Sequence, residues 1–443
     1  MSIIRPGDPA HAASIRRQWE LLANRVRYHS IELPDGRVLP GLQSIAELKQ
    51  RIAVFGLPED LSGKRVLDIG AWDGWFSFEM ERRGAEVVAL DCVPFDTFLE
   101  ARGLLGSKVE YRILDVDEIS PAALGTFDVV LFFGVLYHLR HPLLGLEKVL
   151  SVTRDTALVE SFVAAADPAV RHRACLEFYE TTELGGQLDN WYGPTPECLL
   201  ALCRSAGFAQ VTWAGERNQR ASVVCRRRWP APPPDPLPAP LLRTVTNNRD
   251  YESRFHTGKD EYLLCFFRSG EQAIARDELY VEVDELGTPA LIVSRLTGNE
   301  WQANCLRPPD LKPGAHEVRI RTRASAPSNP VEVVMDAPED APLPEPGGAE
   351  APRITLLDYN SPKDLRYTDR GEIDCYFTSP ERPTVSNTAA LLDGRPCRVK
   401  SILCSEEGYR AKLKIPEQLA PGEHAVRIRT ARSAFSGAVS IKL

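Results

Sequence analysis

Three side chains that can donate or accept a proton stand where a reaction could be catalysed. Tyr137 and His138 directly follow the apolar run Phe127–Gly134, and His29 lies in a short segment closed by a turn signal. An imidazole titrates near physiological pH, so a histidine can take a proton from a reacting hydroxyl group. His138 is therefore the first candidate for a general base and His29 the second, with Tyr137 lining the reacting groups. The alternative for either histidine is a purely structural role as a hydrogen-bonded side chain. His141 precedes Pro142 at an expected helix start and is expected to be structural.

A glycine turn flanked by acidic residues forms a second group of candidates. The run Val66–Gly74 leads from apolar residues through Asp68 into Gly70 and Gly74, and the next apolar strand ends in Asp91. Strand, glycine turn, helix, strand and acid in this order are typical of a βαβ unit with a nucleotide-type ligand at its carboxyl edge. Gly70 lets the backbone approach a ligand closely, and a carboxylate at Asp91 can accept hydrogen bonds from both ribose hydroxyls. A packed turn without a ligand is the structural alternative.

Alternating strands and helices from Lys64 to about Arg228 place these candidates at one edge of a sheet. Such alternation predicts an α/β fold with a mostly parallel sheet and helices on both faces. Ligands bind at the carboxyl ends of such strands, so Phe133–His138 is expected to face the reacting groups. The predicted strands are 65–69, 86–90, 109–114, 127–133, 156–162, 208–213 and 221–226, and the main predicted helices are 74–83, 142–150 and 196–206.

Two segments of this region carry a family resemblance. The run Gly134–Leu143, Gly-Val-Leu-Tyr-His-Leu-Arg-His-Pro-Leu, and the segment Asn190–Thr195 resemble those of the tRNA wobble-uridine carboxymethyltransferases and their methyltransferase-like relatives. The glycine turn resembles motif I of the class I S-adenosylmethionine (SAM) methyltransferases. The resemblance covers about residues 25–215 and implies a Rossmann-like methyltransferase domain with seven strands.

The resemblance also implies a set of cofactor contacts. Val116 and Asp117 would hold the adenine by an apolar flank and a carboxylate, although Asp117 taken alone is equally expected as a helix N-cap. Trp72 stands where generic members carry glycine, and its ring is expected to cover one side of the cofactor pocket. Together with the turn itself, the expected contacts are Asp68, Gly70, Trp72, Gly74, Asp91, Cys92, Val93, Val116, Asp117, Phe133 and Tyr137, and no metal is expected.

The resemblance leaves a choice between two cofactors. The carboxymethyltransferases use a carboxylated SAM, whose extra carboxylate is held partly by a lysine and an arginine. No lysine stands between Met1 and Ala46, although that lysine would fall near Tyr28, and the arginine has no clear position. Ordinary SAM is therefore favoured over carboxylated SAM. The formal charge of −8 does not favour tRNA as an acceptor, because phosphate binding needs clustered Lys and Arg.

The sequence thus predicts a SAM-dependent methyltransferase that acts on a small-molecule or glycan-type acceptor, with O-methylation preferred. The alternatives are a tRNA wobble-uridine modifying enzyme and a SAM-binding scaffold protein without catalysis. The apolar run Val129–Tyr137 is too short to span a membrane, and Met1–Arg17 lacks the apolar core of a signal peptide. With ten cysteines and no C-x-x-C pair, a cytoplasmic protein is expected.

The remainder of the chain contains an internal repeat. Leu311–Thr322 recurs as Leu419–Thr430 at an offset of 108 residues. Each copy alternates apolar and polar residues between turn signals, which predicts two β-sandwich modules that resemble immunoglobulin-like domains. Because strand side chains alternate, Arg319, Arg321 and Arg323 are expected to point outward. This stripe could bind an acidic polymer or a partner, and its structural alternative is a charged face that prevents edge pairing. A protein partner or self-association through the two repeats is also expected.

These patterns divide the chain into segments. Residues 1–60 are expected to form a helical cap with a helix over Pro9–Asn24, and 61–228 the SAM-binding domain. Residues 229–240 are expected to form an extended, semi-rigid proline-rich linker. The first β-sandwich repeat is placed at 241–336, a second linker at 337–352, and the second repeat at 353–443.

Overall fold

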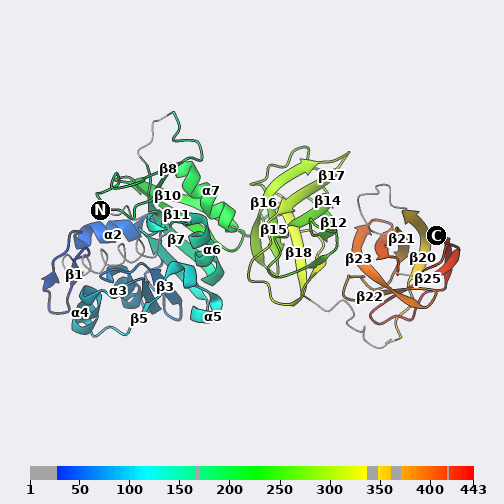
Figure 1. The fold of residues 1–443 in the computed structure, drawn as a ribbon, viewed down its shortest axis with the longest axis horizontal. Coiled ribbons are helices and arrows are strands. Elements are labelled where there is room, and N and C mark those ends of the chain that lie inside the picture. Colours follow the sequence, from blue (N-terminus) through cyan, green and yellow to red (C-terminus); the bar gives the residue numbers. More distant parts are fainter. Residues whose placement is uncertain (1–26, 165–168, 337–347, 361–370, 417–418) are drawn as a thin grey trace, which may run out of the picture. The chain divides into compact units, whose positions relative to one another are not determined.

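The computed structural model describes residues 27–164, 169–336, 348–360, 371–416 and 419–443 (Figure 1). The chain divides into two compact units, Met1–Arg228 and Trp229–Leu443. The helix expected over Pro9–Asn24 and most of the second predicted linker lie outside the described residues. Within the described ranges, no helix is long and apolar enough to cross a membrane.

The first unit is built around a seven-stranded sheet with the strand order β10-β11-β7-β6-β3-β4-β5. The pairs from β5 through β7 are parallel, whereas β11 runs antiparallel to both β7 and β10. The predicted α/β class and the mostly parallel sheet of seven strands are therefore confirmed. The strands are β3 (Arg65–Ile69), β4 (Glu86–Asp91), β5 (Glu110–Ile113), β6 (Phe127–Phe133), β7 (Thr153–Phe162), β10 (Gln210–Arg217) and β11 (Arg220–Arg226).

Two hydrophobic clusters cover the two faces of this sheet. Because strand side chains alternate, Val66 of β3 belongs to one cluster and its neighbour Leu67 to the other. Helices α2, α3 and α4 contribute to the first cluster and α5, α6 and α7 to the second, so the sheet is covered on both faces as predicted. The helices are α2 (Ile45–Ala53), α3 (Trp75–Arg82), α4 (Asp96–Leu105), α5 (Pro121–Leu124), α6 (Pro142–Val152) and α7 (Pro196–Ala206).

Local sequence signals set the helix boundaries. In α7, Thr195 Oγ1 accepts a hydrogen bond from the Cys198 amide (3.2 Å), Pro196 takes the first helical position, and Gly207 ends the helix at φ +112°. Helix α6 begins at Pro142 after His141, as expected, but continues to Val152 and passes directly into β7. Thr153 Oγ1 donates to the Val149 carbonyl (2.7 Å) at this junction, so β7 starts earlier than predicted.

Short elements complete the first unit. Asp115 is the N-cap of η1, because its Oδ1 accepts a hydrogen bond from the Asp117 amide (3.1 Å), so the alternative that Asp117 itself is the N-cap is wrong. Elements β1 and β2 pair with each other, as do β8 and β9. The bounds are β1 (Ile31–Glu32), β2 (Val38–Leu39), η1 (Val116–Glu118), η2 (Leu136–His138), β8 (Leu176–Phe178) and β9 (Tyr192–Pro194).

The described part of the second unit is built from β-strands and repeats one topology. The first module has the order β12-β14-β17-β16-β15-β18-β19-β13, and the second, β20-β21-β24-β23-β22-β25-β26, matches it except for β13. In the first module the long strand β16 pairs with β15 through Leu286–Pro289 and with β17 through Ala290–Arg295, which joins the two halves of the sheet. The strands are β12 (Leu241–Thr246), β13 (Arg254–Phe255), β14 (Leu263–Arg268), β15 (Leu279–Val283), β16 (Leu286–Arg295), β17 (Glu300–Cys305), β18 (Gly314–Thr322), β19 (Val331–Met335), β20 (Arg353–Asn360), β21 (Glu372–Thr378), β22 (Thr388–Leu392), β23 (Arg395–Ser405), β24 (Gly408–Lys414), β25 (Glu423–Thr430) and β26 (Val439–Lys442).

Two expectations about this unit are corrected. Arg321 does not point outward with Arg319 and Arg323 but is 3% exposed, with its guanidinium 4.6 Å from the centre of the Tyr280 ring. Trp229 stacks on Tyr280 at 4.3 Å and donates through Nε1 to the Val281 carbonyl (2.8 Å). A stacked arginine excludes water from both planar groups, so this position is part of the packed module. The start of the proline-rich segment thus packs on the first module and is not a free spacer.

Candidate active site

The glycine turn between β3 and α3 has three residues in the left-handed region: Gly70 (φ +74°), Trp72 (φ +50°) and Gly74 (φ +87°). The amides of Gly70 and Ala71 both donate to the Leu90 carbonyl, at 2.9 and 3.0 Å. A Cβ added at Gly70 would lie 2.4 Å from Val135 Cγ2, and one at Gly74 would lie 2.5 Å from Phe98 Cε2. Both glycines are thus required by close packing as well as by their backbone conformation.

Asp91 ends β4 directly beside this turn. Its Oδ2 accepts a hydrogen bond from the Trp72 amide (3.0 Å) and its Oδ1 from the Cys92 amide (2.9 Å). Burial raises the pKa of Asp91 to about 7. Each carboxylate oxygen can accept more than one hydrogen bond, so both remain able to receive a ribose hydroxyl. A fixed acidic group beside a left-handed turn at the carboxyl ends of two parallel strands fits a nucleoside cofactor.

Asp68 lies near the end of β3, directly before the turn, and supports it. Its side chain is 2% exposed and its Oδ2 accepts a hydrogen bond from Ser77 Oγ (2.6 Å) on α3. Burial raises the pKa of Asp68 to about 6, against the effect of the Ser77 hydrogen bond. Asp68 therefore ties the end of β3 to α3.

The residues expected to face the acceptor follow β6. His138 lies on η2 with its Nδ1 3.1 Å from Asp189 Oδ2, and the side chains of His138 and Asp189 are 18% and 8% exposed. The Tyr137 hydroxyl accepts a hydrogen bond from Arg220 Nη2 (3.3 Å) of β11, and burial raises the pKa of Tyr137. The Tyr137 carbonyl accepts the Trp191 amide at 2.8 Å, which joins η2 to the segment before β9. A carboxylate against one ring nitrogen orients the imidazole.

A buried cluster of charges lies beside Tyr137. Glu160 of β7 is 2% exposed and receives two hydrogen bonds from Arg51 of α2, each 2.8 Å long. Arg220 Nη1 donates to Glu160 Oε1 at 3.0 Å. Burial alone would raise the pKa of Glu160, but the charges of Arg51 and Arg220 outweigh it and hold that pKa below its usual range. Glu160 thus holds together groups from α2, β7 and β11 under the acceptor side.

His29 lies in the wall formed by the amino-terminal cap. It is 5% exposed, its ring meets the Phe76 ring edge-on at 5.4 Å, and its Nδ1 has no hydrogen-bond partner. Burial, together with the charges of Arg51 and Arg220, holds the pKa of His29 well below its usual value. His29 is therefore a neutral imidazole with an unsatisfied nitrogen, which suits a binding contact better than a cationic role.

Acid should destabilise the first unit through His29. The unfolded chain binds a proton near the ordinary histidine pKa of about 6.5, whereas the folded chain does not. This contribution to stability is therefore complete above that pH and falls by up to about 1.4 kcal/mol per pH unit below it. His29→Phe keeps the ring packing and should make stability less dependent on pH between about pH 7.5 and about pH 5.5.

Urea unfolding of the full-length protein, followed by hydrogen exchange of peptides from β3 and β6, measures this difference. His141→Phe is the matched control, because His141 is exposed at the start of α6. Equal pH dependence in wild type and His29→Phe would contradict the buried, neutral state of His29.

The other predicted contacts are distributed unevenly. The Trp72 ring packs between Tyr28 (5.3 Å) and Phe95 (5.2 Å). Phe133 is buried against Phe55 and Phe76, at 5.0 Å from each ring. The remaining four lie along the ends of β4 and β5: Cys92 and Asp117 are exposed, whereas Val93 and Val116 are buried in the two hydrophobic clusters.

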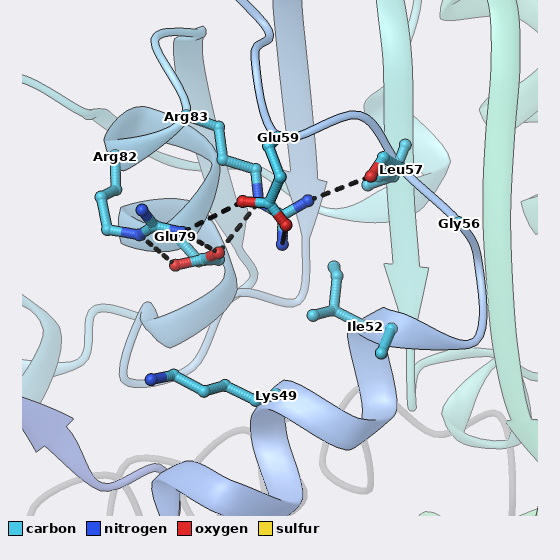
Figure 2. Close-up of a pocket in the computed structure, with 9 residues that line it drawn as sticks. Lys49, Ile52, Gly56, Leu57, Glu59, Glu79, Arg82 and Arg83 are labelled. Carbon is cyan, nitrogen blue, oxygen red and sulfur yellow. Dashed lines mark hydrogen bonds and ion pairs between the residues drawn. The ribbon is translucent and has the colours of Figure 1, made fainter.

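A separate cavity of about 420 Å³ lies near the other end of α3, and none of the predicted site residues lines it. Figure 2 shows that Glu79, Arg82 and Arg83 gather at its rim, with Lys49 and Ile52 of α2 below. Arg82 and Arg83 both pair with Glu79, at 2.7 and 2.9 Å. This cavity is bordered by these ion pairs, and no residue of the glycine turn lines it.

The comparisons with known proteins agree with this architecture. A family model described as a methyltransferase domain matches residues 42–212. The seven-stranded sheet and the glycine turn agree with this match, and the predicted cofactor of such a domain is SAM.

Several curated relatives resemble parts of this domain. A ubiquinone biosynthesis O-methyltransferase from Xanthomonas oryzae pv. oryzae is 38% identical over 19% of this chain and 36% of its own length. A tRNA U34 carboxymethyltransferase from Pseudomonas fluorescens is 30% identical over 34% of this chain and 48% of its own length. A magnesium-protoporphyrin O-methyltransferase from Rhodobacter capsulatus is 31% identical over 31% of this chain and 64% of its own length. The chain thus spans less than two thirds of each of these relatives.

Solved structures show weaker overall similarity. The N-terminal domain of EvdMO1 with S-adenosylhomocysteine (SAH) bound is 22% identical, with a TM-score of 0.38, and the match covers 48% of this chain and 96% of that one. The 1,6-didemethyltoxoflavin-N1-methyltransferase of Burkholderia thailandensis is 18% identical, with a TM-score of 0.36, over 51% of this chain and 92% of that one.

Proposed function

We propose that this protein is a SAM-dependent methyltransferase that methylates a hydroxyl group of a small-molecule or glycan-type acceptor. The observation that carries the proposal is the His138–Asp189 pair, with Nδ1 3.1 Å from Oδ2, at the carboxyl end of β6. SAM, when bound, supplies an activated methyl group. An oriented imidazole can then take the proton of the attacking hydroxyl, while positioning supplies much of the remaining rate enhancement.

The other residues of the site take binding roles in this proposal. Asp91 would accept the ribose hydroxyls, and the turn from Gly70 to Gly74 would lie along the nucleoside. Tyr137 would line the reacting groups, with its hydroxyl fixed by Arg220 (3.3 Å). The buried faces of Tyr137 and Phe133 exclude water from the side of the site that they cover.

Binding of SAH to the purified protein tests the cofactor assignment. Asp91→Asn keeps the size of the side chain but removes one acceptor oxygen and the charge, so SAH affinity should fall by about ten- to a hundredfold. Isothermal titration calorimetry measures this, and Glu110→Gln, on exposed β5, is the matched control. Equal affinity of Asp91→Asn and wild type would contradict the role of Asp91, and absence of SAH binding to wild type would contradict the proposed function.

The tRNA wobble-uridine reaction with carboxylated SAM is the second candidate, and one observation favours it. Tyr137 is one of the cofactor contacts that the resemblance implies, and Arg220 donates a hydrogen bond to its hydroxyl. Arg220 is thus a candidate for the arginine that holds the extra carboxylate in the carboxymethyltransferases. Glu160 already binds this arginine (3.0 Å), so its charge is partly neutralised and ordinary SAM remains favoured. Mass spectrometry of the ligand that co-purifies separates the two: carboxylated SAM supports the second candidate, and SAM or SAH supports the first.

The two β modules carry a proposal of their own. We propose that the two modules, which share one strand order, are immunoglobulin-like domains. We propose further that they bind a protein partner or mediate self-association. If the wild-type protein binds SAH but transfers no methyl group, the result favours the alternative of a SAM-binding scaffold protein without catalysis.

A further inference from the structure

Asp73 lies in the glycine turn, between the left-handed residues Trp72 and Gly74. Its side chain is 0% exposed, and its Oδ2 accepts hydrogen bonds from the backbone amides of Tyr28 (2.6 Å) and His29 (2.8 Å). One carboxylate of the cofactor turn therefore holds two consecutive residues of the amino-terminal cap, more than 40 positions earlier in the chain. Hydrogen bonds to an ionised acceptor are about twice as strong as neutral ones.

The held segment carries groups that reach the acceptor side. The Tyr28 ring packs on Trp72 (5.3 Å), and its hydroxyl accepts a hydrogen bond from Gln43 Nε2 (3.1 Å). Gln43 Oε1 in turn accepts from Arg51 Nη1 (2.6 Å), the arginine that binds Glu160. The hydrogen bond from the His29 amide to Asp73 also fixes the backbone of His29. The ring of His29 is neutral, and its Nδ1 has no hydrogen-bond partner.

A continuous series of hydrogen bonds thus runs from the cofactor turn to Tyr137. It begins at Asp73, passes through Tyr28, Gln43 and Arg51, and continues through Glu160 and Arg220 to the Tyr137 hydroxyl. Asp73 is the residue of the turn that joins this series to the cap. If Asp73 only capped α3, its side chain would accept hydrogen bonds only from the turn and from the first residues of α3.

We propose that Asp73 is a positioning residue that fixes Tyr28 and His29 on the cofactor turn and so completes the acceptor side of the site. This inference rests on the proposed methyltransferase function, because it assigns the two sides of the site to cofactor and acceptor. Asp73 acts through backbone amides and does not touch the reacting groups.

Hydrogen exchange at the amides of Tyr28 and His29 tests the proposal in the full-length protein. Asp73→Ala removes the shared acceptor of both hydrogen bonds and should accelerate exchange at these amides by about ten- to a hundredfold. Asp73→Asn retains a neutral acceptor oxygen and should give an intermediate rate. Asp35→Ala is the matched control, because exposed Asp35 accepts hydrogen bonds from the amide (3.0 Å) and Nε (2.7 Å) of nearby Arg37 within the same cap.

The His29 ring supplies a readout that a merely local role would not change. In the wild type its nuclear magnetic resonance signals should remain those of a neutral ring through mildly acidic pH. In Asp73→Ala the released ring should leave the surroundings of Arg51 and Arg220 and titrate closer to an ordinary histidine. Retained neutrality of His29 together with unchanged amide exchange would overturn the proposal.

Two further measurements keep the outcomes distinct. If Asp73→Ala does not fold, Asp73→Asn decides: exchange rates equal to wild type at both amides would overturn the proposal, and faster rates would support it. SAH titration of the wild type is read separately, because lack of SAH binding contradicts the proposed function, whereas the exchange measurements need no ligand.

Discussion

Replacing His138 by alanine is expected to lower the rate of methyl transfer by about 10²- to 10⁴-fold, the usual contribution of a positioned general base. The imidazole follows the carboxyl end of β6, with Nδ1 held 3.1 Å from Asp189 Oδ2, so the ring is fixed on the side of the sheet where the acceptor is proposed to bind. SAH affinity should remain unchanged, because His138 is not one of the expected cofactor contacts. A labelled-methyl transfer assay, with calorimetry for SAH, separates the two effects.

Two matched variants sharpen this experiment. His141→Ala removes an exposed imidazole three residues away at the start of α6 and should leave transfer unaffected. Asp189→Asn keeps the size of the partner but not its charge, so it should lower transfer less than His138→Ala and shift the pH profile. Unchanged transfer in His138→Ala would remove His138 from the mechanism.

Replacing Glu160 by alanine is expected to destabilise the first unit by about 3–5 kcal/mol. The variant leaves the cationic groups of Arg51 and Arg220 close together without their shared carboxylate, in a region where Glu160 itself is 2% exposed. Removing one partner of a buried ion cluster costs far more than removing an exposed ion pair, because the remaining charges stay poorly solvated. Tyr137 also loses the support of a correctly placed Arg220.

The same chain provides the controls for this measurement. Glu86→Ala breaks the exposed pair with Arg65 (3.3 Å) and should change stability by no more than about 1 kcal/mol. Urea-dependent hydrogen exchange of peptides from β6 and β7 reports the first unit, while peptides from β14 and β17 serve as an internal reference. A change below about 1 kcal/mol in Glu160→Ala would show that the arginines are well solvated in its absence.

The linear pattern of the chain determined the fold of the first unit and where its candidate residues lie. Glycine spacing, apolar strands of the right length and the acids at strand ends act locally, and the carboxyl ends of parallel strands must meet at one edge of the sheet. Asp91, Tyr137 and His138 therefore lie at that edge of the sheet, as expected. The repeat was visible for the same reason, since equal residue patterns gave equal strand orders.

Tertiary structure alone decided which partners these residues have. Asp189 pairs with His138, although 51 positions separate them in the chain. Arg220 donates to Tyr137 across 83 positions. Asp73 accepts the His29 amide across 44 positions. None of these pairs has a periodic or fixed spacing, because each depends on how separate loops and strands pack. Arg321 makes the same point in the second unit: alternation placed it outside, but stacking on Tyr280 buries it.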